Sequence, residues 1–374
     1  MKVLLVFTYG YSLKTWEKSG TLGKELELYN KLSSKYGIKF IFLTYGDARD
    51  IEINLNNEDI KVVPIYSFIK KYENKLLNYI YSFLIPFKVY KKFKEIEKIN
   101  IIKQNQLIGS WVSVILKFLL KKPLYIRTGY DMYKFSIDEK KNSFIVYLYK
   151  ILTKFSFYYS NFYTVSSKSD IEYLNSKLSL KVDKLFLRPN FISTKAFRDY
   201  KNRYRNKILC VGRLERQKNY EYLIKELSGT GIELDIVGEG SLEEELIKIS
   251  KKFNIKLNLL GKIDNHQLKK VYQKYSYFVN PSLFEGCPKT VLEALSNGCV
   301  VIASNIPNHS EIITNYENGY IFDLKPNAFK NLILNINEDK NFEVIKNAEN
   351  TLKSRFLLDS AIEVEYKDYK NLLG

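Results

Sequence analysis

Cysteine and histidine are scarce in this sequence of 374 residues, which contains three cysteines and two histidines. Cys210, Cys287 and Cys299 are odd in number and lack the spacing of metal ligands, so neither a disulfide framework nor a zinc site is expected. The histidines lie far from any pair of cysteines. This usage fits a reduced, cytosolic protein with buried thiols.

Long apolar runs are also missing. No stretch reaches the roughly 18 uncharged apolar residues that indicate a membrane-spanning helix, and the longest candidate, Trp111 to Leu120, contains Lys117. The first apolar segment, Val3–Phe7, is too short for a secretory signal and is typical of a buried first strand. No repeat of roughly 20–50 residues occurs, which excludes a solenoid.

Acidic residues are too few to balance the basic ones, and the formal net charge is +18. Residues 1–200 contain 34 Lys and Arg against 18 Asp and Glu, a balance of +16, whereas residues 201–374 contain 25 against 23, a balance of +2. The excess therefore belongs to the first half. Either a solubilising surface or an anionic partner explains it; a lipid leaflet, a phosphorylated acceptor and nucleic acid are such partners.

Lysines are interleaved with aromatic and aliphatic residues in two segments of the first half, residues 66–98 and 134–159. Basic helices with apolar faces can lie on an anionic membrane surface. Ordinary helices that cover a sheet would show much the same pattern in a chain of this composition. Both interpretations stay open, and the membrane surface is the favoured one.

Strand-like and helix-like segments alternate along the chain, which indicates α/β architecture with parallel sheets. The alternation lapses into a polar stretch from Arg188 to Tyr204, and the chain is too long for one ordinary core. We therefore expect two domains, at residues 1–195 and 205–355. Buried strands are predicted at Val3–Phe7, Lys39–Thr44, Lys61–Ile65, Leu124–Arg127, Phe162–Val165, Lys207–Val211, Glu233–Val237, Leu257–Leu260, Tyr277–Asn280 and Val300–Ala303.

The segment from Phe284 to Ala294 contains two carboxylates, Glu285 and Glu293, with a glycine and a proline between them. Their spacing alone carries little weight, because Glu17 and Glu25 share it. What distinguishes the first pair is its setting in the predicted fold.

That setting points to a phosphate ligand. Glu285 follows a predicted strand end, where ligands of open α/β sheets bind, and Pro288 suits the first turn of a helix. Backbone N–H groups near Gly286 to Lys289 could then face a phosphate. Because a diphosphate would repel carboxylates, we expect them to accept hydrogen bonds from hydroxyl groups, of a sugar at Glu285 and of a ribose at Glu293.

A diphosphate also needs cations, and a second segment supplies them. Arg213 directly follows a predicted strand, and Lys218 comes shortly afterwards, before a helix. Arg213 could bind through its guanidinium fork and Lys218 as a point charge. Two solvated loop cations are the alternative that composition alone leaves open.

Four segments together resemble the family 4 glycosyltransferases, which are retaining, nucleotide-sugar-dependent enzymes of the GT-B fold. The resemblance covers residues 205–325 in the family's order and is thin in the first half. It implies an α/β protein with two Rossmann-like domains whose parallel sheets face an interdomain cleft. The segments are Gly212-Arg213…Lys218-Asn219, Val237-Gly238-Glu239-Gly240, Leu260-Gly261-Lys262 and Pro281-Ser282-x2-Glu285-Gly286-x-Pro288…Glu293-Ala294.

The resemblance implies a role for each matched residue. Arg213 and Lys218 would neutralise the leaving diphosphate. Glu285 would contact the donor sugar, Glu293 would hold the ribose, and the backbone of Gly261 to Ile263 would touch the base. The implied catalytic residues are Arg213, Lys218 and Glu285. The implied donor-binding residues are Gly20, Gly212, Arg213, Lys218, Gly261, Lys262, Ile263, Glu285, Gly286, Cys287, Pro288, Lys289, Thr290 and Glu293. No metal or other cofactor is implied, in agreement with the lack of an Asp-x-Asp motif.

Cys287 lies inside the motif and raises the question of a nucleophile. No base is near it in the sequence, so we expect a small buried thiol instead.

The first domain offers weaker signals. Residues 19–26 follow the first predicted strand as a glycine-containing loop that enters a helix; they resemble the family's loop that meets the donor phosphates, and a plain turn is the alternative. Many relatives carry a histidine after a middle strand of this domain. The corresponding segment here offers Asp131 instead, which puts a histidine role at the acceptor in doubt. The acceptor-side candidates are Thr21, Lys24, Tyr130 and Asp131.

The implied activity is transfer of a hexose, with retained anomeric configuration, from a UDP- or GDP-linked sugar to a glycan or a polyprenyl- or other lipid-linked acceptor in cell-surface polysaccharide or glycoconjugate synthesis. We expect a cytoplasmic enzyme that contacts the inner face of an anionic membrane through its basic first domain, with a final helix at residues 358–374 packed on that domain. A nucleotide-sugar epimerase of similar fold is one alternative. A non-catalytic protein that binds nucleic acid or membrane is another, although the basic half contains no recognised nucleic-acid motif and no nucleic-acid partner is expected.

Overall fold

The computed structural model describes residues 1–193 and 203–374, except for the side chains of Asn265 and His266. The chain divides into two compact units. The N-terminal unit comprises Met1–Ser166, Asp170–Arg188 and Ala361–Gly374, and the C-terminal unit comprises Ser167–Ser169 and Pro189–Ser360. Most of the predicted linker between residues 195 and 205 lies outside the described residues.

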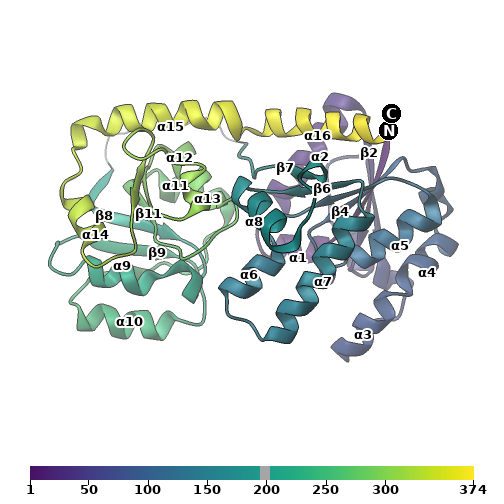
Figure 1. Cartoon of the computed structure of the whole chain (residues 1–374), viewed down its shortest axis with the longest axis horizontal. Coiled ribbons are helices and arrows are strands. Elements are labelled where there is room, and N and C mark those ends of the chain that lie inside the picture. The colour runs from purple at the N-terminus through teal and green to yellow at the C-terminus, as the bar shows by residue number, and fades with distance from the viewer. Residues whose placement is uncertain (194–202) are drawn as a thin grey trace. The chain divides into compact units, whose positions relative to one another are not determined.

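A parallel sheet of seven strands forms the centre of the N-terminal unit, in the order β3-β2-β1-β4-β5-β6-β7. Figure 1 labels β2, β4, β6 and β7 of this sheet. The five strands that the sequence predicts in this half are confirmed, and the sequence does not predict β4 or β7. The strands are β1 (Lys2–Val6), β2 (Lys39–Thr44), β3 (Ile60–Pro64), β4 (Ile101–Asn105), β5 (Leu124–Arg127), β6 (Phe162–Val165) and β7 (Leu185–Leu187).

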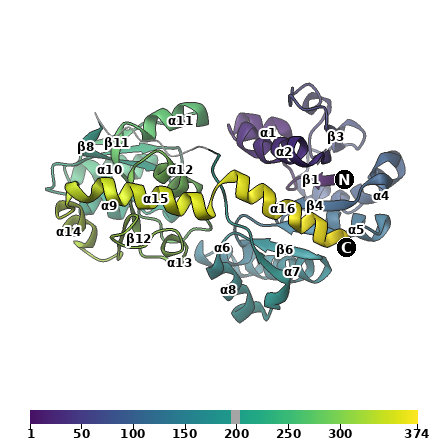
Figure 2. The same cartoon turned by 90° about the horizontal axis from the view of Figure 1, so that it is seen from above.

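Helices flank this sheet, with α16 near α2 and α5 near α4 (Figure 2). The helices are α1 (Leu13–Lys18), α2 (Leu22–Tyr36), α3 (Lys75–Ser82), α4 (Ile85–Lys92), α5 (Ser110–Leu120), α6 (Met132–Asp138), α7 (Ser143–Tyr159), α8 (Lys168–Leu178) and α16 (Leu358–Leu373). Short 3-10 turns occur at Ala48–Asp50, Ile65–Ser67, Lys94–Lys98 and Val182–Lys184.

The end of α16 packs on strands of the N-terminal unit. Glu365 of α16 forms a buried ion pair with Lys103 of β4. Asp368, one turn later, accepts a hydrogen bond from Nε of Arg188 at 2.7 Å. These contacts explain why a strand with a polar sequence can lie inside the sheet, since the lysine of β4 finds its counter-charge on α16.

The C-terminal unit contains a parallel sheet of six strands in the order β10-β9-β8-β11-β12-β13. All five strands that the sequence predicts here are confirmed, and β13 is added. The strands are β8 (Tyr204–Val211), β9 (Glu233–Val237), β10 (Leu257–Leu259), β11 (Tyr275–Asn280), β12 (Val300–Ser304) and β13 (Tyr320–Phe322). The helices are α9 (Tyr220–Glu226), α10 (Glu243–Lys252), α11 (Asn265–Tyr272), α12 (Lys289–Ser296), α13 (Pro307–Ser310), α14 (Ala328–Leu334) and α15 (Asn341–Arg355), with 3-10 turns η5 (Arg216–Lys218) and η6 (Glu338–Lys340).

Two hydrophobic cores lie on the two faces of the C-terminal sheet. Leu209 of β8 belongs to one core, whereas Ile208 and Cys210 belong to the other. Successive side chains of a strand point to opposite faces, so both faces of β8 are buried. The ends of the strands, rather than their faces, are therefore where polar side chains can meet a ligand.

Candidate functional site

Two loops meet at the carboxyl edge of the C-terminal sheet. One follows β8, from Gly212 to Lys218, and the other follows β11, from Pro281 to Pro288. β8 and β11 are parallel neighbours, so both loops leave the same edge of the sheet. The N–H of Leu283 donates to the Gln217 carbonyl, and the Gln217 side chain donates to the Phe284 carbonyl, both at 2.9 Å. These two bonds fix the loops against each other.

Glu285 is the centre of the polar contacts at this edge. It is 8% exposed and forms an ion pair with Nζ of Lys218. The Ser282 hydroxyl donates to its carboxylate at 2.7 Å, and the Gln217 amide does so at 3.4 Å. Burial alone would raise the pKa of Glu285, but the charge of Lys218 and the bond from Ser282 outweigh it and hold the pKa below its usual range. Glu285 is therefore an ionised carboxylate held by several donors.

Lys218 reaches Glu285 by passing over a glycine. A Cβ atom on Gly212 would lie 2.9 Å from Cε of Lys218 and 2.9 Å from the Tyr220 hydroxyl oxygen. Gly238 lies against the backbone of Gly212. Its φ is +145°, and a Cβ atom there would lie 2.0 Å from the Gly212 carbonyl oxygen. Gly212 thus leaves space for the path of the lysine, and Gly238 leaves space for the backbone of Gly212.

Arg213 is the second cation of the site, and it is exposed. Its Nη2 atom lies 3.5 Å from Oε1 of Gln217. Gln217 is buried and also contacts Glu285, so it connects the arginine to the carboxylate. The structure therefore brings the three predicted catalytic residues to one edge. The sequence analysis missed Gln217, since its contacts come from a loop 68 positions further along the chain.

Glu293, the other carboxylate of the predicted pair, lies on α12. Pro288 is the N-cap of this helix, which places Glu293 in its second turn. The Tyr272 hydroxyl donates to Oε2 of Glu293 at 3.2 Å. Burial and the charge of Glu293 raise the pKa of Tyr272 well above its usual value, so the tyrosine remains a donor.

The remaining motif residues differ in exposure. Lys289 is exposed and Thr290 is half-buried, whereas the buried ones are Gly286, Cys287 and Pro288. The Cys287 carbonyl accepts a hydrogen bond from Nδ2 of Asn190 at 2.6 Å. Its side chain belongs to a hydrophobic core, which agrees with the buried thiol that the sequence predicts.

The loop from Gly261 to Ile263 follows β10. Gly261 has a φ of +63°, and its carbonyl accepts a hydrogen bond from the Gly238 N–H at 2.9 Å. Lys262 is exposed, and Ile263 is half-buried against a core. Contact between this backbone and a nucleobase stays a prediction.

His309 has no assigned role in the sequence analysis, yet the structure buries it close to Glu285. Its Nδ1 atom lies 2.9 Å from the Ser304 carbonyl oxygen. The Ser304 hydroxyl donates to the Ser282 carbonyl at 2.6 Å, so His309 supports the loop that carries Glu285. Burial lowers the pKa of His309 to about 4, although the charge of Glu285 opposes this shift. No local pattern marks this histidine, because β12 and α13 bring it to the loop.

Gly20, Thr21 and Lys24 lie at the start of α2 in the N-terminal unit. Gly20 has a φ of +71°, and Thr21 is the N-cap of the helix. The glycine-containing loop enters a helix, α2, and α1, which the sequence analysis does not predict, lies between β1 and this loop. The Ser12 hydroxyl accepts a hydrogen bond from the Thr15 N–H and so starts that additional helix.

Asp131 is the N-cap of α6 and is buried. Its Oδ1 atom accepts a hydrogen bond from the Lys134 N–H at 2.7 Å, and its Oδ2 atom has no hydrogen-bond partner among the described residues. Burial raises the pKa of Asp131 to about 7, against the Lys134 bond and with a contribution from Asp170. The neighbouring Tyr130 is 40% exposed. Their acceptor-side roles stay predictions.

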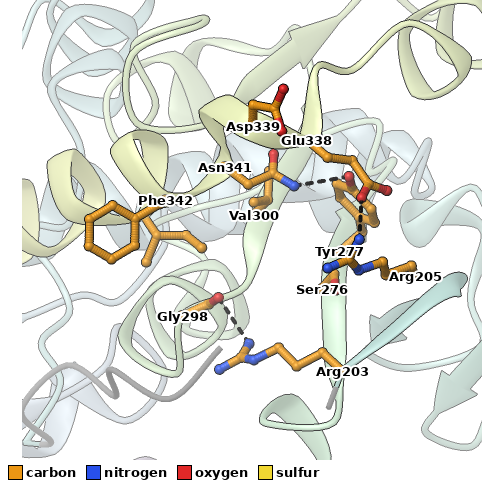
Figure 3. A pocket seen from close by; sticks show the side chains of 11 residues that line it. Arg203, Arg205, Ser276, Tyr277, Gly298, Val300, Glu338, Asp339, Asn341 and Phe342 are labelled. Atoms are coloured by element: carbon orange, nitrogen blue, oxygen red, sulfur yellow. Dashed lines mark hydrogen bonds and ion pairs between the residues drawn. The ribbon is translucent and has the colours of Figure 1, made fainter. Parts of the chain in front are cut away.

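A separate pocket lies near the amino ends of the C-terminal strands (Figure 3). Arg205 forms an ion pair with Glu338 at 2.8 Å, and Asn341 donates to the Tyr277 hydroxyl at 3.0 Å. Arg203 donates to backbone carbonyls, among them that of Gly298 at 2.9 Å. The two arginines of this pocket therefore already bind groups of the protein. The pocket lies at the edge of the sheet opposite to Glu285.

Sequence comparisons relate the C-terminal unit to a known family. Residues 193–351 match the family model described as glycosyl transferases group 1. The N-acetylgalactosamine-N,N'-diacetylbacillosaminyl-diphospho-undecaprenol 4-alpha-N-acetylgalactosaminyltransferase of Campylobacter jejuni is 28% identical over 253 residues, 64% of this chain and 67% of that protein. The UDP-Gal:alpha-D-GlcNAc-diphosphoundecaprenol alpha-1,3-galactosyltransferase of Escherichia coli is 26% identical over 290 residues, 72% of this chain and 74% of that protein.

Solved structures resemble the whole chain. Sucrose-phosphate synthase of Thermosynechococcus elongatus has a TM-score of 0.76 at 16% identity, and the match covers 100% of this chain and 99% of that one. The Anabaena protein HepE in complex with UDP has a TM-score of 0.74 at 14% identity, with coverage of 99% and 100%. At such low identity these matches bear on the fold alone.

Proposed function

We propose that this chain, a glycosyltransferase of the GT-B fold that is similar to family 4, transfers a hexose from a nucleoside diphosphate sugar and retains the anomeric configuration. The acceptor that we propose is a glycan or a lipid-linked sugar in the synthesis of a cell-surface polysaccharide. The C-terminal unit would bind the donor, and the N-terminal unit would bind the acceptor.

The observation that carries this proposal is the group formed by Lys218, Glu285 and Arg213 at the ends of β8 and β11. A diphosphate bound there would meet two cations and the N-terminal end of α12, which is the positive end of the helix dipole and favours anions. Glu293 on α12 suits a ribose, since its Oε2 already accepts a hydroxyl hydrogen bond from Tyr272.

The chemical step separates charge. The bond between the anomeric carbon and the diphosphate oxygen breaks with its electron pair on the diphosphate, while an acceptor hydroxyl bonds to the same carbon and gives its proton to the departing diphosphate oxygen. Arg213 and Lys218 would stabilise the developing negative charge, and loss of either would raise the barrier by about 2.7–4 kcal/mol, by analogy with oxyanion donors. Because these cations can neutralise the leaving group, we propose that no metal ion is required.

Glu285 would act before and during this step. In the structure it holds Lys218 in place, which preorganises the lysine without a ligand. A sugar hydroxyl could replace one of its present donors, such as the amide of Gln217 at 3.4 Å. The ammonium group of Lys218 would then also interact with the diphosphate.

The acceptor class is proposed from the relatives. The Campylobacter jejuni and Escherichia coli enzymes are named for acceptors linked to undecaprenol through a diphosphate. HepE was solved with UDP. We therefore propose a UDP- or GDP-linked donor, a polyprenyl-diphosphate-linked acceptor, and peripheral contact with the cytoplasmic face of a membrane that carries this acceptor.

A transfer assay with product NMR tests the proposal. Purified protein, a panel of UDP- and GDP-sugars and a short-chain polyprenyl-diphosphate sugar should yield a glycoside with the anomeric configuration of the donor. The yield should persist in EDTA. An inverted product would contradict the retaining mechanism, and dependence on a divalent cation would contradict the proposed role of the two cations.

Two variants separate the roles of binding and turnover. Arg213→Ala should mainly lower kcat, since its charge matters most as the leaving group forms, whereas Glu293→Ala should mainly raise the Kd for the donor. Arg216→Ala is the matched control, because it removes an exposed arginine from the same loop. Steady-state constants equal to those of the control in both variants would contradict the assigned roles.

A further inference from the structure

Three helices of the N-terminal unit expose large apolar side chains. Leu76 of α3 and Phe144 of α7 are each 67% exposed, and Ile80 of α3 is 55% exposed. The exposed apolar residues of α3, α4, α7 and the turn between α3 and α4, here called the apolar surface, are Leu76, Leu77, Tyr79, Ile80, Phe83, Leu84, Phe87, Phe144, Ile145, Tyr147, Leu148, Ile151 and Tyr158. So many exposed apolar side chains on neighbouring helices of one unit indicate an interaction site.

Helix α7 exposes most of the apolar residues in its first half. Its buried residues are Thr153, Ser156 and Phe157, all in the second half, whereas Phe144, Tyr147 and Leu148 are exposed. A helix that covers a sheet normally turns its apolar stripe to the core. Packing within the unit therefore does not explain the apolar side chains in the first half of α7.

Helix α5 joins α3 and α7 into one region of the unit. Trp111 of α5 packs against Tyr79 at 5.0 Å and Phe83 at 5.7 Å between ring centroids. On the other side, the hydroxyls of Ser110 and Ser156 lie 2.7 Å apart and connect α5 to α7. Figure 1 shows α3, α4, α5 and α7 next to one another in this unit.

The segments that carry the apolar surface contain many lysines and almost no acidic residues. Residues 70–94 contain seven lysines and one glutamate, and residues 140–160 contain four lysines and no acidic residue. Among the described residues, Lys75, Lys88 and Lys91 form no ion pair with a carboxylate. Such a charge disfavours a second copy of the same surface, and it favours an anionic partner that can also accept aliphatic side chains.

We propose that the apolar surface docks on an anionic lipid bilayer. Its leucines, isoleucines and aromatic rings would enter the boundary between headgroups and acyl chains, while the lysines would lie at the phosphates. In the part of the chain that the structure describes, no helix combines the length and apolarity needed to cross a membrane. This inference rests on the proposed function for the presence of a membrane, and it assigns the contact to particular helices.

Flotation with vesicles tests the inference on the full chain. Wild type should float with vesicles of phosphatidylcholine and phosphatidylglycerol, and much less with phosphatidylcholine alone. Leu76→Ser with Ile80→Ser, and separately Phe144→Ser with Leu148→Ser, should each lower the partition coefficient roughly tenfold or more. Lys88→Gln should lower it about fivefold, and added salt should remove this difference.

Leu334→Ser with Phe342→Ser is the matched control, because these residues of the C-terminal unit are 55% and 66% exposed. The control should float like wild type, and all variants should keep the melting temperature of wild type. Flotation of both apolar variants at the wild-type level would overturn the inference. So would variants that change only the oligomeric state in size-exclusion chromatography with light scattering, or a wild type that retards DNA and ignores vesicles.

Failure of this inference can be told apart from failure of the proposed function. Nucleotide binding to the C-terminal unit needs no membrane, so thermal shifts with UDP or GDP should be unchanged in the apolar variants. A wild type that floats but binds no nucleotide would contradict the proposed function and leave the docking surface supported.

Discussion

Glu285 and Lys218 form a pair whose two members depend on each other. The side chains of both are largely buried, with 12% of Lys218 and 8% of Glu285 exposed. Breaking a buried pair by removal of one partner is costly, because the other charge stays buried without compensation. The pair therefore has a structural role that precedes any catalytic one.

We predict that Lys218→Met lowers the free energy of unfolding by about 3–5 kcal/mol, since the Glu285 carboxylate loses its counter-charge. Adding Glu285→Gln should recover much of this loss, because the buried negative charge is then gone. Transfer activity should stay low in both proteins. Urea denaturation measures the stabilities, and a double variant no more stable than the single one would contradict the coupling.

His309 makes the stability of the C-terminal unit depend on pH. Its pKa is lowered from 6.5 to about 4 in the folded protein, chiefly by burial. Between these values the unfolded chain binds the proton more tightly, so stability is complete above pH 6.5 and is lost as pH falls toward 4.

We expect the imidazole to account for a loss of about 2 kcal/mol between roughly pH 7 and pH 5. His309→Gln should lose less over the same interval. The measurement is urea denaturation of both proteins at several pH values. An identical dependence on pH in the two proteins would show that the histidine does not titrate on unfolding.

At the scale of elements, the sequence predicts strands well where apolar residues are continuous. β2 is found at the predicted residues because Lys39–Thr44 is almost entirely apolar after its first residue. β4 escapes prediction because its sequence ends in Lys103-Gln104-Asn105, all of which are buried. A distant helix explains the burial of Lys103, since Glu365 of α16 pairs with it.

The same contact gives a prediction for α16. Glu365→Ala should destabilise the N-terminal unit by about 3–5 kcal/mol, since Lys103 would stay buried without its partner. Glu363→Ala is the control on the same helix, because Glu363 pairs with Lys35 at the surface, where a salt bridge contributes at most about 1 kcal/mol. Thermal and urea unfolding report the difference. Equal losses in the two variants would contradict the role of the buried pair.

The candidate site was predictable where its residues are local in sequence. Arg213 and Lys218 share one loop, and Glu285 follows a strand end that the apolar pattern identifies. Gln217 and His309 were not predictable, because they reach the site only through contacts between loops that are distant in sequence and that the sheet brings together. Their residue types alone gave no reason to prefer them.

At the scale of the whole molecule, the excess positive charge and the candidate donor site lie in different halves of the chain. Residues 1–200 carry +16 and include the apolar surface, whereas residues 201–374 carry +2 and contain the Lys218–Glu285 pair. This distribution agrees with the two proposals made above, in which the basic N-terminal unit docks on the membrane and the nearly neutral C-terminal unit binds the donor.

Nucleotide binding by the intact protein is the most direct test, because every proposed step begins with a nucleoside diphosphate at the Arg213 and Lys218 edge. At about 100 times its Kd, UDP or GDP should stabilise wild type by roughly 2.7 kcal/mol in a thermal shift experiment. Free UDP and GDP carry the full charge of the departed leaving group, which the intact donor does not. The Arg213→Ala protein should therefore show a smaller shift at the same concentration, and the Arg216→Ala control should match wild type. No shift with either nucleotide, or an undiminished shift in Arg213→Ala, would contradict the proposed donor site.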